Sequence, residues 1–233
     1  MSSPGEVFPA IRDALTEHYG RPGSPYAGLD SFEAFVSVVL DLAFEAKARA
    51  AVVDALREEG FLDPQAIAEA DPSELDEALR SSGLKNPKGA LGPLRRLARW
   101  LVDLHHGDLD PLHGQNGVIS TFQLRDELLM VNGIGPPTAD TILLFALGRP
   151  VYPIDRATYR ILLRHGWIDP DSGYDDARDV VERLAPDVPE MLATFSFWMD
   201  RVGREFCRAS VPKCERCPLR PFLPETGPVM PEG

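Results

Sequence analysis

The sequence lacks apolar runs long enough to cross a membrane. Its longest ones, such as Phe35 to Leu40 and Thr141 to Leu147, are far shorter than the roughly 20 residues that a membrane helix needs. The N-terminus also lacks the pattern of a secretory signal peptide. These absences predict a protein with no membrane partner and a cytoplasmic location.

Positive charge is also scarce, with 24 Lys and Arg residues against 36 Asp and Glu residues, for a formal charge of -12. This balance argues against a protein that binds DNA through bulk positive charge, although it does not exclude a local basic face. Acidic residues concentrate between Asp54 and Glu77. Basic residues fall into clusters that are either solvated helix faces or parts of a binding surface: Lys85, Lys88, Arg95, Arg96, Arg99; Arg156, Arg160, Arg164; and Arg201, Arg204, Arg208.

Cysteine is rare, and the three cysteines of the chain, Cys207, Cys214 and Cys217, lie close together. An odd number of cysteines cannot pair completely into disulfides. The clustering therefore favours a metal site in a reducing compartment over a disulfide framework.

The chain shows no sustained alternation of apolar and polar residues, which strands would require. A period of 3.6 residues recurs instead, and it places Phe32, Phe35, Val36, Val39, Leu40 and Ala43 on one helical face. Segments rich in Gly, Pro, Asn or Ser at 20–28, 83–89, 107–117 and 169–173 indicate loops. We therefore predict an all-α protein with many short helices.

The segment from Leu128 to Leu147 predicts a hairpin of two helices. One helix is expected to end at Val131 and the next to begin at Pro136. Between them, Gly133 and Gly135 can adopt a positive φ or let another backbone approach closely, and Ile134 would anchor the turn in the core. Backbone amides at the start of the second helix would then face an anion such as a DNA phosphate. A plain helix corner that needs glycine is the alternative.

The block from Leu128 to Leu162 resembles the helix-hairpin-helix and Gly/Pro-Asp region of the HhH-GPD DNA glycosylases related to endonuclease III. Further resemblance extends over residues 32–43, 80–101 and 199–219. It implies a two-lobed helical fold with a central cleft, made of a six-helix barrel at residues 29–149 and a second domain at residues 1–28 plus 150–233. It also implies a monomer that binds double-stranded DNA containing a damaged base. Gly133, Ile134, Gly135, Thr138 and Arg156 are the corresponding DNA-binding candidates.

Asp155 directly precedes a helix expected at about Arg156 to Arg164, so its simplest role is that of an N-cap. The resemblance adds a catalytic role, because the matching aspartate stabilises positive charge on the sugar and helps to activate the nucleophile. The two roles are compatible.

Three positions depart from the family pattern. Pro137 stands where bifunctional members carry the lysine that forms a Schiff base, so covalent amine chemistry is not expected. Leu42 aligns with or next to the DNA-inserting glutamine, and it is either an apolar wedge or one more core residue. Leu223 occupies the fourth ligand position of the family's iron-sulfur loop, after Cys207, Cys214 and Cys217.

This cysteine loop could hold a cluster completed by Glu225 or water, a three-iron cluster, zinc or no metal. Its basic residues Arg208 and Lys213 are candidates for phosphate contact in every case. Candidates for base stacking are Tyr26, Phe44, Trp100, Tyr152 and Trp167.

The sequence thus predicts a base excision repair glycosylase that flips a damaged base and hydrolyses its glycosidic bond, with Asp155 as the essential carboxylate and without strong AP-lyase activity. The alternative is a catalytically inactive protein of the same fold that binds DNA structures. A third and weaker hypothesis is a helical protein that does not bind nucleic acid. The residues do not indicate which lesion is the substrate.

Overall fold

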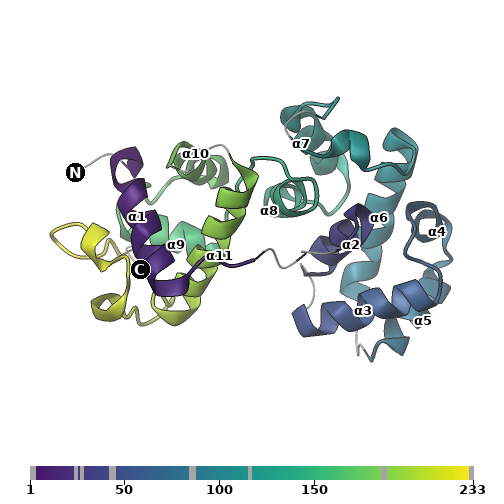
Figure 1. Cartoon of the computed structure of the whole chain (residues 1–233), viewed down its shortest axis with the longest axis horizontal. Helices are drawn as coiled ribbons and strands as arrows, with labels where there is room; N and C mark the ends of the chain where they lie inside the picture. The colour runs from purple at the N-terminus through teal and green to yellow at the C-terminus, as the bar shows by residue number, and fades with distance from the viewer. Residues whose placement is uncertain are drawn as a thin grey trace. The chain divides into compact units, whose positions relative to one another are not determined.

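The computed structural model describes residues 4–23, 26, 29–41, 46–83, 88–114, 117–184 and 188–230. Every regular element in these ranges is helical, which confirms the all-α prediction (Figure 1). None of the described helices is both long and apolar enough to span a bilayer. The chain divides into two compact units, which we call the terminal unit (Met1–Pro25 with Pro150–Gly233) and the middle unit (Tyr26–Arg149).

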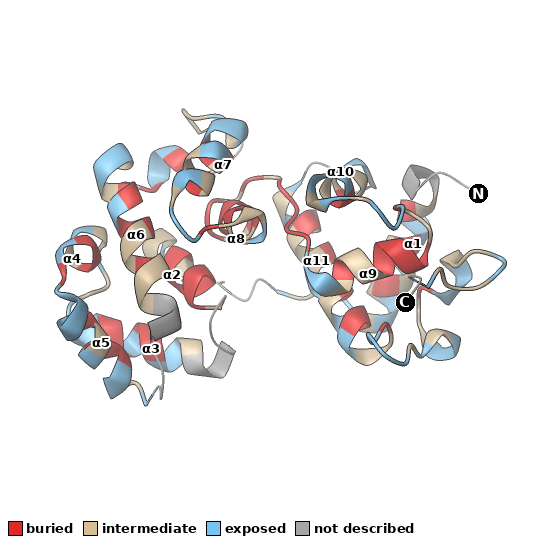
Figure 2. Ribbon diagram, turned by 180° about the vertical axis from the view of Figure 1, so that it is seen from behind, coloured by how far each residue is buried: buried red, intermediate tan, exposed pale blue. Residues whose placement is uncertain are grey.

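The middle unit surrounds one buried helix. Its elements are α2 (Ser31–Asp41), α3 (Ala46–Glu58), α4 (Pro64–Glu69), α5 (Pro72–Ser81), α6 (Lys88–His105), the 3₁₀ turn η1 (Asp110–Leu112), α7 (Thr121–Met130), α8 (Pro136–Thr141) and the π-helical turn η2 (Ile142–Ala146). All residues of α2 from Phe35 to Leu40 are buried, and α2 packs against η2, α3 and α6 (Figure 2). The helix is therefore enclosed on all sides, whereas the sequence indicated one apolar face.

Three helices of this unit begin after residues that are favoured as N-caps. Asp63, Asp71 and Ser120 each accept a hydrogen bond from an amide in the first turn of α4, α5 and α7, respectively. In α4 and α5 the next residue is a proline, whose missing N–H costs nothing at the first helical position. The loops thus set where each helix starts.

The terminal unit combines both ends of the chain. It contains α1 (Pro4–Tyr19), α9 (Arg156–Arg164), α10 (Tyr174–Leu184), α11 (Pro189–Glu205) and the 3₁₀ turns η3 (Cys214–Arg216) and η4 (Arg220–Phe222). Phe8 of α1 packs edge-on against Phe195 of α11, and the Trp198 indole donates a hydrogen bond of 2.9 Å to the Gly20 carbonyl. These contacts explain why the first residues belong with the last ones.

Helices α9 and α11 pack closely enough to require glycine. A Cβ on Gly203 of α11 would lie 2.4 Å from the Cβ of Ala157 in α9. This close approach fixes α9, whose first residue follows Asp155.

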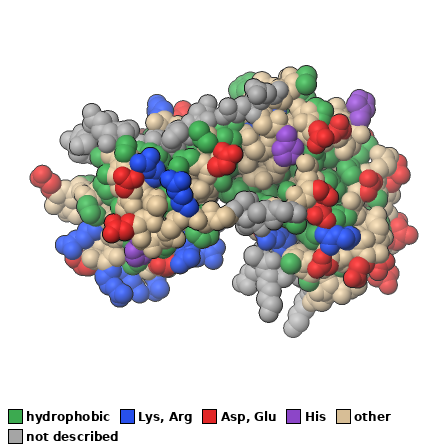
Figure 3. Space-filling view, in the orientation of Figure 1, with side chains coloured by type: hydrophobic (Ala, Val, Ile, Leu, Met, Phe, Trp, Pro, Cys, Tyr) green, Lys and Arg blue, Asp and Glu red, His purple; other side chains and the backbone are tan. Residues whose placement is uncertain are grey.

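Charge of each sign gathers in patches on the face that Figure 3 shows. On this face Lys and Arg side chains lie along one edge of the terminal unit, and Asp and Glu side chains lie over much of the middle unit. The excess of negative charge therefore does not cover the whole surface.

Candidate active site and nucleic-acid interface

The hairpin connects α7, which ends at Met130, one residue before the expected end, to α8, which begins at Pro136 as expected. Gly133 adopts a φ of +83°, a conformation that favours glycine, and Ile134 is 5% exposed and lies in the core. Gly135 has a φ of -96° and a ψ of 174°, and a Cβ there would meet its nearest neighbour, Pro137 Cδ, at 3.9 Å. Of the two possibilities that the sequence left open for these glycines, Gly133 adopts the positive φ, whereas Gly135 has an extended conformation that other residues also adopt.

A buried ion pair holds the two helices of the hairpin together. Arg125 of α7 places its Nε 2.6 Å and its Nη2 3.3 Å from the two carboxylate oxygens of Asp140 in α8, and the Asp140 side chain has no exposed surface. Sequence reasoning missed this pair because the two residues are distant along the chain. Only the hairpin brings them together.

The turn has backbone donors that no described residue of the protein accepts from. Within the described ranges, the amide N–H groups of Gly133, Gly135 and Thr138 have no acceptor. Pro136 and Pro137 have no N–H to offer, and Pro137 is exposed at the position where an amine would be needed for covalent catalysis. The hairpin can therefore bind an anion through amides, but through fewer of them than a start without prolines would provide.

Asp155 is exposed and caps α9, as the sequence indicated. Its Oδ1 accepts a hydrogen bond of 2.6 Å from the Thr158 amide, while its other carboxylate oxygen accepts none from the described residues. The preceding segment is anchored to α10, because the amide of Tyr152 donates to Glu182 (2.9 Å) and the amide of Ile154 donates to the Tyr174 hydroxyl (3.2 Å). The free oxygen of the carboxylate is thus held in a defined position, and Arg156 next to it is exposed.

Tyr152 supports this cap from within the core. It is fully buried, and its hydroxyl lies 3.3 Å from the Thr158 hydroxyl. Burial, and after it the charge of Asp155, raise the pKa of Tyr152 well above its usual value, so the phenol remains protonated. Tyr152 and the buried Trp100 are therefore core residues, which corrects their assignment as stacking candidates.

The other end of α9 holds the cysteine loop. Arg164, only 2% exposed, donates from Nη1 to the Arg208 carbonyl (2.7 Å) and to Cys207 Sγ (3.3 Å), and from Nη2 to the Ala209 carbonyl (3.0 Å). Arg160 donates to the Cys207 carbonyl at 2.7 Å. These two arginines of the predicted basic cluster are thus structural.

The two basic side chains of this loop that the sequence singled out for phosphate contact are exposed. Arg208 and Lys213 are exposed, and the Lys213 amide donates to the Phe206 carbonyl at 2.8 Å. The loop backbone is therefore held in place while its basic side chains face solvent.

The three cysteines do not form a site for a four-iron cluster. They line one cavity with Leu223, but its volume is about 10 Å³, which is at most enough for one water molecule. Among the described residues, no three Cys, His, Asp or Glu side chains are grouped to hold a metal ion. Burial raises the pKa of the Cys217 thiol to about 11.

His165, next to this cavity, does not supply the missing ligand. Its ring nitrogens lie 2.8 Å from the Ile161 carbonyl and 3.3 Å from the Leu219 carbonyl, and burial lowers its pKa. Both nitrogens already face backbone oxygens.

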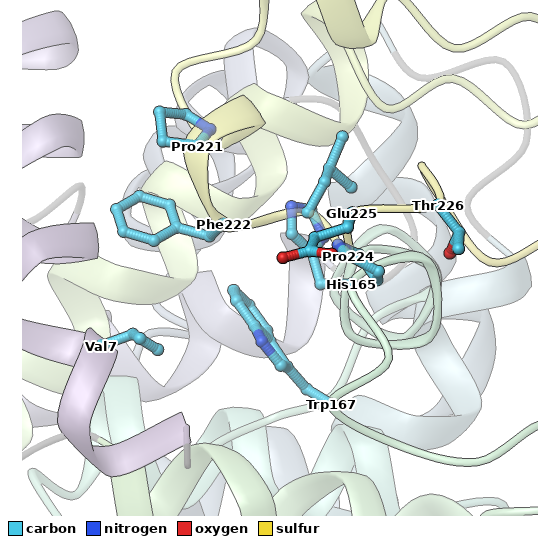
Figure 4. A pocket seen from close by; sticks show the side chains of 9 residues that line it. Val7, His165, Trp167, Pro221, Phe222, Pro224, Glu225 and Thr226 are labelled. Atoms are coloured by element: carbon cyan, nitrogen blue, oxygen red, sulfur yellow. The ribbon is translucent and has the colours of Figure 1, made fainter. Parts of the chain in front are cut away.

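A larger hollow of about 570 Å³ in the terminal unit shares His165 and Leu223 with the cysteine cavity. Figure 4 shows the Trp167 and Phe222 side chains facing it, between Val7 of α1 and the chain segment at Pro224 and Glu225. Trp167, a candidate for base stacking, lines it, whereas Asp155 and the candidates for phosphate contact do not. We therefore assign it no part in base hydrolysis. Leu42 and Phe44 lie outside the described residues.

Comparison with known proteins identifies the family. The family model for HhH-GPD superfamily base excision DNA repair proteins matches residues 36–187. A Methanocaldococcus jannaschii protein provisionally named a DNA repair glycosylase is 27% identical over 217 residues, covering 93% of this chain and 96% of its own. A thymine/uracil-DNA glycosylase of Pyrobaculum aerophilum is 28% identical over 174 residues, covering 72% and 70% of the two chains.

The fold agrees with this relationship. A structure of a non-covalent endonuclease III-DNA complex matches with a TM-score of 0.71 and 22% identity, covering 97% of each chain. Because the family model covers more than half of the sequence, the chain belongs to the HhH-GPD superfamily of base excision DNA repair proteins.

Proposed function

We propose that this protein is a monofunctional DNA N-glycosylase that binds duplex DNA, flips out a damaged base and hydrolyses its glycosidic bond with water. The observation that carries the proposal is the free carboxylate oxygen of Asp155, exposed at a rigid helix start, in a chain that has Pro137 in place of an amine nucleophile. The proposal concerns a monomer with one damaged nucleotide as substrate.

The chemistry follows from the charge that develops as the bond breaks. Departure of the base leaves positive charge on the sugar, which the Asp155 carboxylate stabilises, and the same carboxylate orients and helps to deprotonate the attacking water. A capped aspartate suits this role because the bond from the Thr158 amide fixes one oxygen and leaves the other for the reaction. Pro137 has no amine, so no covalent enzyme-DNA intermediate forms there.

DNA binding is attributed to the hairpin and to the exposed basic residues. The free amides of Gly133, Gly135 and Thr138 would hold a phosphate without reading sequence. Arg156, Arg208 and Lys213 would add charge. No step of the reaction requires a metal at the cysteine loop, whose proposed role is to present these basic side chains.

The test is incubation with duplexes that carry deaminated, alkylated, oxidised or abasic sites. Uracil and mismatched thymine come first, because a relative is named for them. We expect an abasic product that is cut only after alkali, and no protein-DNA adduct with borohydride. A trapped adduct would refute the monofunctional claim.

The second candidate is an inactive DNA-structure binder of the same fold. It is favoured by the loss of the amine at Pro137 and of the cluster ligand at Leu223. Salt-dependent binding to duplexes without turnover on any lesion would support it over the glycosylase.

A further inference from the structure

The arginines of the basic cluster on α6 have two different roles. Arg95 donates to the Ala70 carbonyl at 2.9 Å, and Arg99 donates to the Ala68 carbonyl at 3.2 Å. Both carbonyls lie at the end of α4, where backbone acceptors have no partner within the helix. Arg95 and Arg99 therefore stabilise the packing of α4 on α6.

Arg96 makes no such contact. Within the described ranges it has no hydrogen bond or ion pair, and its Nε is buried without a partner. Its side chain as a whole is half-buried. A partly buried guanidinium without a counter-charge loses hydration and gains nothing in return, so a ligand with negative charge would stabilise it.

The guanidinium of Arg96 lies against the hairpin turn. An ideal Cβ built on Gly133 would be 2.9 Å from its Nη2, and one built on Gly92, one turn earlier on α6, would be 3.0 Å from its Nη1. The guanidinium thus occupies space that two glycines leave open. Gly133 is one of the residues whose amide has no acceptor.

This placement compensates for what the hairpin lacks. Pro136 and Pro137 remove two amides from the first turn of α8. A guanidinium offers several N–H donors and a full charge, and its hydrogen bonds to phosphate are about twice as strong as neutral ones. The net charge of -12 makes such a local cation more important, because the rest of the surface repels DNA on average.

We propose that Arg96 is a DNA-binding residue of the hairpin, where its guanidinium and the free amides of the turn bind the same backbone phosphate of duplex DNA. This inference rests on the proposed function, since it assigns a new contact to the same interface. Arg96 acts on affinity and leaves the chemistry at Asp155 unchanged.

The experiment measures binding of a short fluorescent duplex with a stable abasic-site analogue over a series of salt concentrations. Arg96→Ala is compared with Arg99→Ala, which removes the same charge from the same helix, and with Arg96→Lys. For Arg96→Ala we expect a loss of affinity of about tenfold at low salt and a salt slope smaller by about 0.9, as for one lost phosphate contact. Arg99→Ala should keep the slope of the wild type, and Arg96→Lys should restore it.

Failure of the proposed function and failure of the role of Arg96 give different results. If the wild-type protein itself binds the duplex without salt dependence, the proposed function fails. If the wild type binds with salt dependence but Arg96→Ala and Arg99→Ala have the same slope, the interface stands and the role of Arg96 is refuted. Thermal unfolding of each variant shows whether a loss of affinity comes from unfolding. If Arg96→Ala does not fold, the salt slope of the folded Arg96→Lys variant still tests whether a positive charge at this position contacts phosphate.

Discussion

Helices α8 and α9 begin in opposite ways. At α8 the cap is Gly135, and among the described residues no side chain caps the first turn and no group accepts from the amides of Gly135 and Thr138. At α9 the cap is Asp155, whose own carboxylate accepts the amide of Thr158. The positive end of one helix is thus open to an external anion, while the other is already occupied by an anion of the protein.

The two helix starts suit different functions, DNA binding at α8 and catalysis at α9. An open start with an adjacent cation is suited to hold the phosphate backbone, which carries no information about the base. A start closed by a carboxylate is suited to chemistry, because the cap keeps the reacting group in one orientation. Changes at the two starts should therefore affect binding and turnover separately, and the following predictions test this.

The largest effect is expected at the start of α9, which Asp155 caps. Asp155→Asn should lower excision of a damaged base by about 10²- to 10⁴-fold in single-turnover assays, since the amide stabilises no positive charge. Asn is an equally good cap, so the fold and DNA affinity should change little. Asp155→Ala serves as the comparison that also removes the cap, and full turnover in the Asn variant would exclude Asp155 from the mechanism.

The next effect concerns the ion pair of Arg125 and Asp140, which joins α7 to α8. Asp140→Ala leaves the Arg125 guanidinium without its buried partner and should lower the free energy of unfolding by about 3–5 kcal/mol in urea titrations. Asp200→Ala is the control, because its pair with Arg204 is at the surface and should contribute less than about 1 kcal/mol. Similar losses in both variants would contradict a special role for the buried pair.

A smaller effect should distinguish the two glycines of the turn. Gly133→Ala imposes a positive φ on a residue with a Cβ and crowds Arg96, so we expect a loss of about 1–2 kcal/mol and weaker DNA binding. Gly135→Ala fits the extended conformation and should be neutral or stabilising by less than about 1 kcal/mol. Thermal unfolding and duplex titration measure both, and equal losses would show that Gly135 has a backbone role after all.

The smallest effect is expected at the cysteine loop. Without a cluster, Cys214→Ser should change the unfolding free energy by no more than about 0.5 kcal/mol, because Cys214 is half-buried and no metal ligand would be lost. Iron analysis and visible absorbance of the purified protein check the premise. A brown protein with stoichiometric iron that is bleached and destabilised by the substitution would overturn it.

Some features of the site could be predicted because they are local. The Gly133 turn, the restart at Pro136 and the cap at Asp155 each depend on the conformational preferences of a few consecutive residues. The helical period likewise predicts the all-α class. The absence of an amine at position 137 is a property of the sequence itself.

Other features depend on residues that are distant in the sequence. The pairing of Arg125 with Asp140, the burial of Tyr152 and the hold of Arg164 on the cysteine loop could not be read from spacing. Three arginines of α6 belong to one basic cluster in the sequence, yet Arg95 and Arg99 bind α4 while Arg96 lies against the hairpin.

The sequence by itself thus determined the helical class, the two helix starts and the chemistry that the hairpin lacks, because each follows from local backbone preference or residue type. Tertiary structure alone decided which charged groups are paired, buried or free, because packing brings distant segments together and sets the solvation of each group. For this protein, the step from a pattern of arginines to one candidate phosphate ligand depended on that packing.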